Sequence, residues 1–122
     1  MPQKLSFPIL IAVFLGGGIG ASARFGIELL LPTTNQELYL TTLVNLLGAL
    51  ALGFVNNHQF FSEPLRKHFV GPGFLGSFTT MSALAAIAAG AGSDGLLYWI
   101  FVAGQLALGV ALYILGTKLV TK

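Results

Sequence analysis

Residues 71–82 read GPGFLGSFTTMS and lie inside an uncharged window of the chain. The run combines one proline, three glycines and four hydroxyl side chains. Proline removes a backbone donor and clashes with the preceding turn of a helix, and glycine loses more conformational freedom in a helix than other residues do. The composition therefore predicts a helix that is interrupted within this run, with backbone N–H and C=O groups released at the interruption.

The rest of the chain is strongly apolar. Of its 122 residues, 55% are hydrophobic and 8% are charged, whereas an average soluble domain has about 25% charged residues. So few charges cannot cover the surface of a soluble globule, and the high apolar content excludes a disordered chain. The absence of cysteine excludes disulfides and thiol chemistry. We expect a small integral membrane protein that binds no nucleic acid, in spite of its net charge of +2.

Charged residues divide most of the chain into four uncharged windows, 5–23, 38–62, 68–93 and 95–117. Each is about as long as the roughly 20 residues that cross the hydrocarbon core as a helix. Because lipid offers no partner to backbone polar groups, such windows are expected to be helical. We therefore expect an all-α membrane fold in which residues 1–122 form a single domain. Its four transmembrane helices are expected near 6–30, 39–61, 69–92 and 95–117.

The polar side chain of Asn45 lies within the second of these helices. An unpartnered amide in hydrocarbon is costly, so Asn45 either bonds to another helix or faces a polar pathway. The interruption predicted in residues 71–82 favours the pathway, because irregular backbone at membrane depth is tolerated where it lines a cavity or holds an ion. The two features together predict a permeation protein.

Small residues recur at helical spacings. The clearest sets are Gly16 with Gly20, Ala49 with Gly53, and Gly109 with Gly116. Because lipid gives helices no hydrophobic reason to associate, such smooth faces indicate close helix–helix packing. Four helices offer more of these faces than one bundle can use, which predicts an oligomer.

Other patterns point to function classes that we set aside. The run after Lys4 imitates a signal peptide, but glycines interrupt it. Residues 16–21 match a dinucleotide fingerprint without the strand that it needs. His58 and His68 flank the second connection, where an interfacial position is favoured over metal binding. No histidine or carboxylate lies in the interior of a span to activate a hydroxyl group, so we expect no enzyme activity.

Three motifs resemble those of one membrane protein family. Residues 16–25 read GGGIGASARF, residues 41–48 read TTLVNLLG, and residues 73–84 read GFLGSFTTMSAL. In order and spacing these motifs resemble the Fluc (CrcB) family of fluoride ion channels, and the resemblance extends over the whole chain.

The resemblance implies an antiparallel dimer with two pores that passively exports F⁻ from the cytoplasm, across the plasma (inner) membrane of a prokaryote. By the same implication, Asn45 and Ser82 belong to the ion path. Amide and hydroxyl donors in a narrow, dehydrating path suit the selection of fluoride against chloride.

The resemblance also implies a structural metal ion and a structural arginine. The backbone carbonyls of Gly76 and Thr79 would come from both subunits and hold one Na⁺ at the dimer interface. Arg24 would lie near a helix end, where it can pair with Glu28.

The chain departs from the family pattern at the pore wall. Met81 and Leu84 stand where the family has two phenylalanines. Phenyl rings present electropositive edges to an anion, whereas Met and Leu keep the wall apolar without that attraction. Two interpretations stay open at this point. One is a tolerated substitution in a conducting channel, and the other is a poorly conducting subunit whose partner supplies the aromatic pair.

A second function class is a proton-coupled exporter of the small multidrug type, which is also an antiparallel dimer of four-helix chains. Such a transporter needs a membrane-embedded acid. The candidate in this sequence is Glu28, at the far end of the first span and beside Arg24. That depth and that neighbour favour the channel.

The charges at the ends of the spans predict an orientation. With four spans, both termini and the second connection share one side, which collects Lys4, Arg66, Lys67, Lys118 and Lys122. The opposite side has Arg24. The positive-inside rule then places both termini in the cytoplasm. Because so strong a bias predicts a single orientation, an oppositely oriented paralogue is a more natural partner than a second copy of this chain.

Overall fold

The computed structural model describes residues 4–30, 37–90 and 92–120, and its regular structure in these residues is entirely helical. The three long helices are α1 (Phe7–Leu30), α2 (Glu37–Asn57) and α6 (Gly95–Lys118). The segments between α2 and α6 are the 3-10 turn η1 (Gln59–Phe61), α3 (Pro64–His68), the π-helix η2 (Phe69–Leu75), α4 (Gly76–Phe78), α5 (Met81–Ala89) and the 3-10 turn η3 (Gly92–Asp94).

The long helices have the length and composition of membrane spans. The apolar segments Phe7–Leu30, Tyr39–Asn57 and Gly95–Lys118 are each long enough to cross a bilayer. Most of the large apolar side chains that the structure describes are exposed, and among these described residues Leu84 is fully buried and packs beside Val102. A surface this apolar needs lipid or protein to cover it. The chain is a multi-pass membrane protein.

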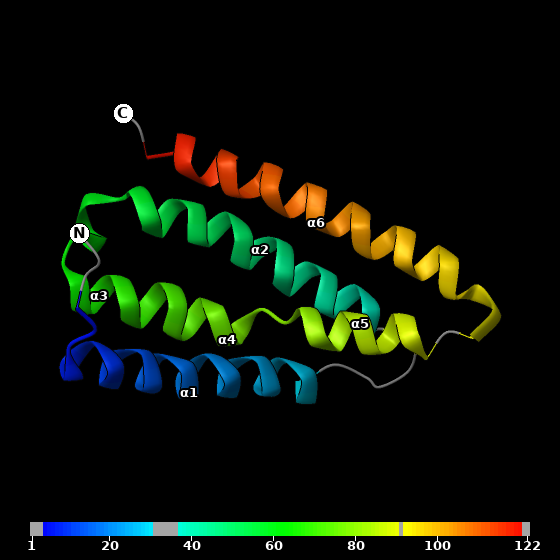
Figure 1. Ribbon diagram of the computed structural model, residues 1–122, viewed down its shortest axis with the longest axis horizontal. Helices are drawn as coiled ribbons and strands as arrows, with labels where there is room; N and C mark the ends of the chain where they lie inside the picture. The colour runs from blue at the N-terminus through cyan, green and yellow to red at the C-terminus, as the bar shows by residue number, and fades with distance from the viewer. Residues whose placement is uncertain (1–3, 31–36, 91, 121–122) are drawn as a thin grey trace.

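The helices lie side by side in a layer (Figure 1), in the order α6, α2, the run α3–η2–α4–α5, and α1. The closest packing joins α2 to α6 and α1 to η2. The start of α1, the end of α6 and the short helix α3 all lie at the same end of the molecule.

Glycines allow the close packing of α1 on η2. A Cβ atom on Gly16 would collide with the carbonyl oxygen of Phe69, and one on Gly20 would collide with that of Phe74. The close packing predicted for this G-x-x-x-G pair is confirmed.

Glycines play the same part between α2 and α6. A Cβ atom on Gly53 would collide with the carbonyl oxygen of Tyr113, and one on Gly116 would collide with that of Leu50. Both of these small faces are therefore used inside the single chain.

The helical run that contains residues 71–82 is irregular in two places. At the end of η2, the N–H of Gly76, the next residue, donates to the Gly71 carbonyl five residues earlier, and this wide turn contains Pro72. The chain passes through Pro72 without a break, because a π-helical turn loosens the contacts that a proline would violate in an α-helix. The helix then ends at Phe78, and Thr79 is extended, with φ −84° and ψ 151°.

The run begins at Pro64, five residues before the predicted start. The Glu63 carboxylate accepts hydrogen bonds from the N–H groups of Leu65 and Arg66, and Pro64 occupies the first turn. A carboxylate cap followed by proline is a favourable helix start. By contrast, α2 ends at Asn57, before the predicted end at residue 61. At this helix end the Asn57 side chain donates to the Gly53 carbonyl at 2.9 Å.

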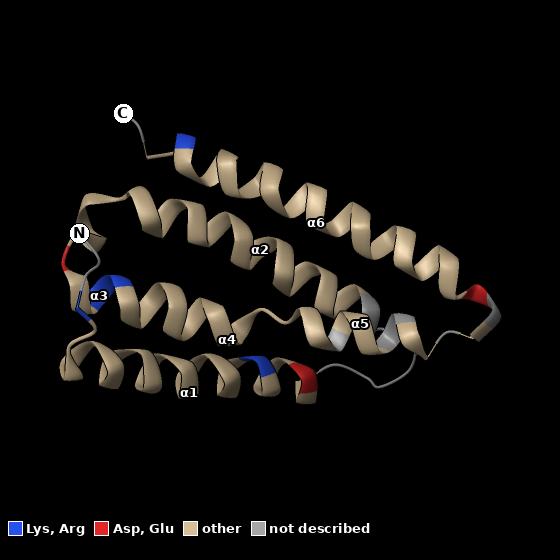
Figure 2. Ribbon diagram, in the orientation of Figure 1, with Lys and Arg blue, Asp and Glu red and all other residues tan. Residues whose placement is uncertain are grey.

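Charged residues lie near both ends of the layer, and the one basic and one acidic residue of α1 lie near the end of that helix, part-way along the layer (Figure 2). Lys4 precedes α1, Arg66 and Lys67 lie in α3, and Lys118 lies in the last turn of α6, so these four share one end. Lys122 and the first connection, residues 31–36, lie outside the described residues.

The packing of α1 on η2 makes a testable prediction. Gly16→Ala should destabilise the fold by about 1 to 3 kcal/mol, because its Cβ atom meets backbone that cannot turn away. Gly18→Ala is the matched control, since a Cβ atom there meets nothing within 4 Å. The control should be neutral or stabilising by up to about 1 kcal/mol, through helix propensity. Unfolding of both variants in detergent, followed by circular dichroism, measures the difference. Equal stability of the two would contradict this account.

Candidate functional site

Asn45 closes the interruption between α4 and α5. Its Nδ2 atom donates to the Thr80 carbonyl oxygen at 2.9 Å, and its Oδ1 atom accepts from the Thr80 N–H at 2.7 Å. The side-chain amide thus replaces a peptide group as the partner of the backbone that the helix has released. This satisfies both backbone polar groups of Thr80, which would be costly to leave unpaired in a membrane.

The neighbouring residues of α2 and α4 fit this arrangement. Gly48, almost one turn after Asn45, lets the methyl group of Thr79 approach α2, because a Cβ atom on Gly48 would occupy the same space. The Thr79 hydroxyl donates to the Leu75 carbonyl at 2.9 Å and helps to end the helix. Because the Thr80 N–H bonds to Asn45, the Gly76 carbonyl lacks the donor that would follow it by four residues in an α-helix.

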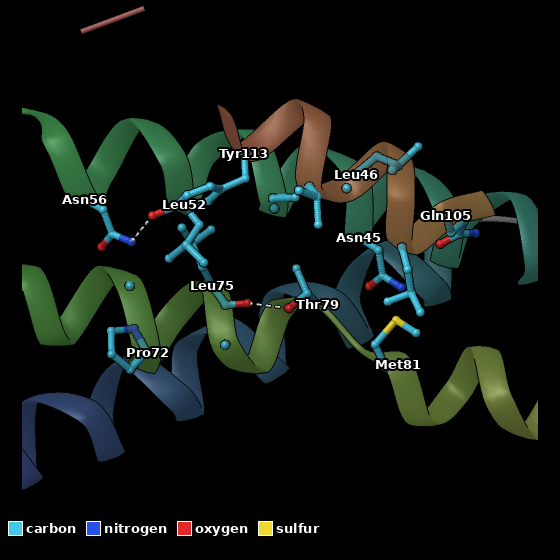
Figure 3. A pocket seen from close by; sticks show the side chains of 17 residues that line it. Asn45, Leu46, Leu52, Asn56, Pro72, Leu75, Thr79, Met81, Gln105 and Tyr113 are labelled. Atoms are coloured by element: carbon cyan, nitrogen blue, oxygen red, sulfur yellow. Dashed lines mark hydrogen bonds between the residues drawn. The ribbon is translucent and has the colours of Figure 1, made fainter. Parts of the chain in front are cut away.

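An open groove of about 570 Å³ runs past the interruption (Figure 3). It lies between α2, the segment η2–α4 and α6, and most of its lining is apolar. Four of its residues bring amide or phenol groups into this lining, namely Asn45, Asn56, Gln105 and Tyr113. A mostly apolar cleft with a few polar groups is the usual form of a small-ligand site.

Two of these polar residues come from a helix in which we expected no functional side chain. On α6, the buried Gln105 donates from Nε2 to the Thr42 hydroxyl, and Tyr113 Oη accepts from Asn56 Nδ2 at 3.2 Å. The signal was present in the sequence, because the argument that singled out Asn45 applies equally to amides at 56 and 105 in apolar windows. Both pairs join α2 to α6.

The structure brings four of the predicted site residues together and separates the other three. Asn45, Gly76, Thr79 and Met81 all line the groove, and Met81 is 42% exposed. Ser82, Leu84 and Arg24 lie apart from this lining. Ser82 is exposed on α5, with its hydroxyl 3.1 Å from that of Thr80, while Leu84 is buried against Val102.

Arg24 lies on α1, eight residues after Gly16. Its Nε atom is 3.8 Å from Oε1 of Glu28, so the expected pairing of the two side chains is present. The same Nε atom is buried and makes no hydrogen bond with the described residues. Arg24 is not part of the groove lining.

The ligands available for a metal ion near the interruption are neutral oxygen atoms. Within the described residues, no group of three His, Cys, Asp or Glu side chains could hold a metal. At the groove, by contrast, the Gly76 carbonyl has lost its helical hydrogen-bond donor. The space beside Gly76 is open, since a Cβ atom there would meet nothing closer than the Gly71 carbonyl oxygen, at 3.8 Å. Backbone carbonyls suit a hard cation such as Na⁺, so the residues at the interruption fit such an ion.

Comparison with known proteins extends these observations. The profile of a family described as "CrcB-like protein, Camphor Resistance (CrcB)" matches residues 11–117. The chain belongs to the CrcB family.

Curated relatives of this CrcB chain carry informative names. It is 36% identical to "Fluoride-specific ion channel FluC 1" of Yersinia pestis, over 89% of this chain and 94% of that protein. It is 38% identical to "Fluoride-specific ion channel FluC 2" of Bacillus subtilis, over 88% and 84%. It is also 32% identical to "Fluoride-specific ion channel FluC 2" of Leifsonia xyli, over 98% and 92%.

The bonds of Asn45 in this CrcB protein predict a stability effect. Asn45→Leu should cost about 2 to 5 kcal/mol, because it removes both hydrogen bonds that the Asn45 side chain makes to the part-buried backbone of Thr80. Asn57→Ala is the control. It also removes a hydrogen-bonding amide from α2, but one that is exposed and bonds within its own helix. The change in unfolding free energy in detergent should be several times larger for Asn45→Leu, and a cost near that of the control would refute the structural role given to Asn45.

Proposed function

We propose that this chain is a subunit of a fluoride-selective channel that passively exports F⁻ across a prokaryotic plasma membrane. The observation that carries the proposal is the interruption held by Asn45, which opens on a groove in a chain whose CrcB relatives are named fluoride channels. A negative-inside membrane potential drives an anion outward through such a path without a coupled ion.

The chemistry of the groove supports an anion path. Its apolar lining would strip water from an ion, and a small, strongly hydrated anion then needs strong donors in exchange. Asn45 keeps one N–H beyond the bond to Thr80, and the Tyr113 hydroxyl accepts from Asn56, so its own proton is left to donate. Ser82 lies outside the groove lining, and its hydroxyl is 3.1 Å from that of Thr80, so its expected part in the ion path would be played through Thr80.

The proposed assembly is an antiparallel dimer of four-helix chains, in which α3–η2–α4 and α5 make up the broken third span. The groove supports this, because it leaves polar groups at membrane depth open on one face of a single chain, and a second subunit would enclose them. The Gly76 and Thr79 carbonyls of both subunits would hold one Na⁺ at the interface. When bound, this ion would be coordinated by these carbonyl oxygens and would link the two chains.

The two residues that replace phenylalanines, Met81 and Leu84, play different parts in the proposed channel. Met81 lines the groove and stands where an aromatic edge would meet the ion. Leu84 packs against Val102 and holds α5 in place from behind. Replacing Leu84 by phenylalanine would overpack a fully buried position, so Met81 is the substitution that we expect to limit conduction.

We propose further that the natural assembly is a heterodimer with an oppositely oriented paralogue. Four described basic residues at one end of the layer, against Arg24 near the end of α1, support a single orientation with both termini in the cytoplasm. The numbered names of the relatives, FluC 1 and FluC 2, agree with paired chains.

The exporter is the weaker alternative. Its acid would be Glu28, whose carboxylate is half exposed and lies beside the Arg24 guanidinium. An acid paired in this way is poorly suited to exchange a proton for a drug.

Fluoride flux tests the proposed function. The chain, purified alone and reconstituted in fluoride-loaded liposomes, should release fluoride slowly, without a proton gradient and without releasing chloride. Met81→Phe should raise the rate, and co-reconstitution with the paralogue should raise it further. A fluoride electrode and a chloride electrode measure both ions. Fast flux from the unmodified chain would overturn the poorly conducting subunit but not the channel. Flux that requires a proton gradient would establish the exporter.

Topology tests the heterodimer. A reporter fused after Lys122 should be found on the cytoplasmic side in almost all molecules, because the basic end of the layer resists translocation. Replacing Lys4, Arg66 and Lys67 by glutamine should shift part of the population to the opposite orientation. A reporter distributed equally on both sides in the unmodified chain would favour a homodimer.

A further inference from the structure

A second groove lies on the opposite side of the η2 segment from α2. It has a volume of about 470 Å³ and is walled on one side by α1 and on the other by α3 and the start of η2. The α1 wall is formed by Pro8, Ile11, Ala12 and Leu15. These positions share one helix face and extend over about 10 Å, at 1.5 Å per residue. Ile11 is 43% exposed and Leu15 is 52% exposed, so the groove is open along its length.

One charged side chain, Arg66, completes this apolar lining. Two contacts hold its guanidinium at the rim. Its Nε atom donates to the Glu63 carboxylate at 3.1 Å, and its Cζ atom lies 4.5 Å from the centre of the Phe60 ring. The terminal Nη groups of such a guanidinium remain to bind a phosphate in the two-pronged manner that arginine favours.

The surroundings of the groove favour an anion over a cation. Lys4 and Lys67 lie at the same end of the layer as Arg66, and Glu63 is the acid nearest to them. The hydrogen bond from Arg66 lowers the pKa of the Glu63 carboxyl. The ionised Glu63 carboxylate accepts hydrogen bonds from the N–H groups of Leu65 and Arg66 and from Arg66 Nε, so its oxygens already have donors.

We propose that this groove binds an anionic phospholipid, with an acyl chain along α1 and the phosphate at Arg66. An apolar channel that ends at a basic rim matches such a lipid at both ends, because anionic headgroups bind basic pockets between membrane helices. The site is independent of the proposed channel activity. None of its lining residues belongs to the groove beside Asn45.

Lipid retention tests the site. The purified full-length protein is titrated in detergent with phosphatidylglycerol and with phosphatidylcholine of the same acyl chains, and bound lipid is counted by native mass spectrometry. Phosphatidylglycerol should bind about fivefold more tightly, the effect of one basic side chain near an anionic headgroup. Arg66→Gln should abolish the preference, and Arg66→Lys should keep most of it. Ala12→Phe, which fills the groove, should weaken the binding of both lipids.

Lys118→Gln is the matched control, because it removes one positive charge from the same end of the molecule but outside the groove. It should bind both lipids as the unmodified protein does. Equal affinity for the two lipids, or equal effects of Arg66→Gln and Lys118→Gln, would overturn the proposal. The chain has no cysteine, so Ile11→Cys also reports a protein occupant, and disulfide-linked dimers through that single thiol would overturn it as well.

Discussion

The pair of hydrogen bonds between Asn45 and Thr80 is the constraint on which the site depends. A helix can stop inside a membrane only if the peptide groups that it releases find other partners. Asn45 supplies a donor and an acceptor from one side chain, and it thereby ties the interruption to α2. The close approach of Thr79 to Gly48 follows from this attachment, as does the Gly76 carbonyl without its helical donor. The groove takes its shape from the same contact.

Much of the fold could be predicted from charge spacing. The helices α1 and α6 begin and end within a residue or so of their predicted bounds, and α6 fills its uncharged window because lipid excludes charges and demands helix between them, whereas α1 continues beyond its window through Arg24 and Glu28. The start of the third helical run was wrong, because the Glu63 cap and Pro64 extend it across charged residues that the spacing argument treats as a boundary. The wide turn at Pro72 could not be predicted either, because a proline in sequence does not distinguish a break from a π-helical turn.

The candidate site could be predicted only in part. An amide at position 45 in an apolar span had to have a partner, but nothing in the sequence identifies Thr80, which is 35 residues away. Met81 and Leu84 were expected to share a wall. The path of the backbone through Thr79 and Thr80 decides the direction of α5, and that direction leaves Met81 in the groove and Leu84 behind it. Gln105 and Tyr113 lie in the last span, in which we expected no functional side chain, although polar groups in an apolar window need partners there as much as in the second span.

The π-helix η2 decides how the helical run responds to the loss of a residue. A π-helical turn contains one more residue than an α-helical turn. Deleting one residue between Phe69 and Leu75 would therefore let the run become α-helical, with the later side chains keeping nearly the same direction relative to α3. Deleting one residue within α3 would instead rotate every later side chain by about 100°. The Thr80 peptide would then turn away from Asn45, although no residue of the site had changed. Between the Glu63 cap and the interruption, η2 is the segment in which a single deletion should disturb the site least.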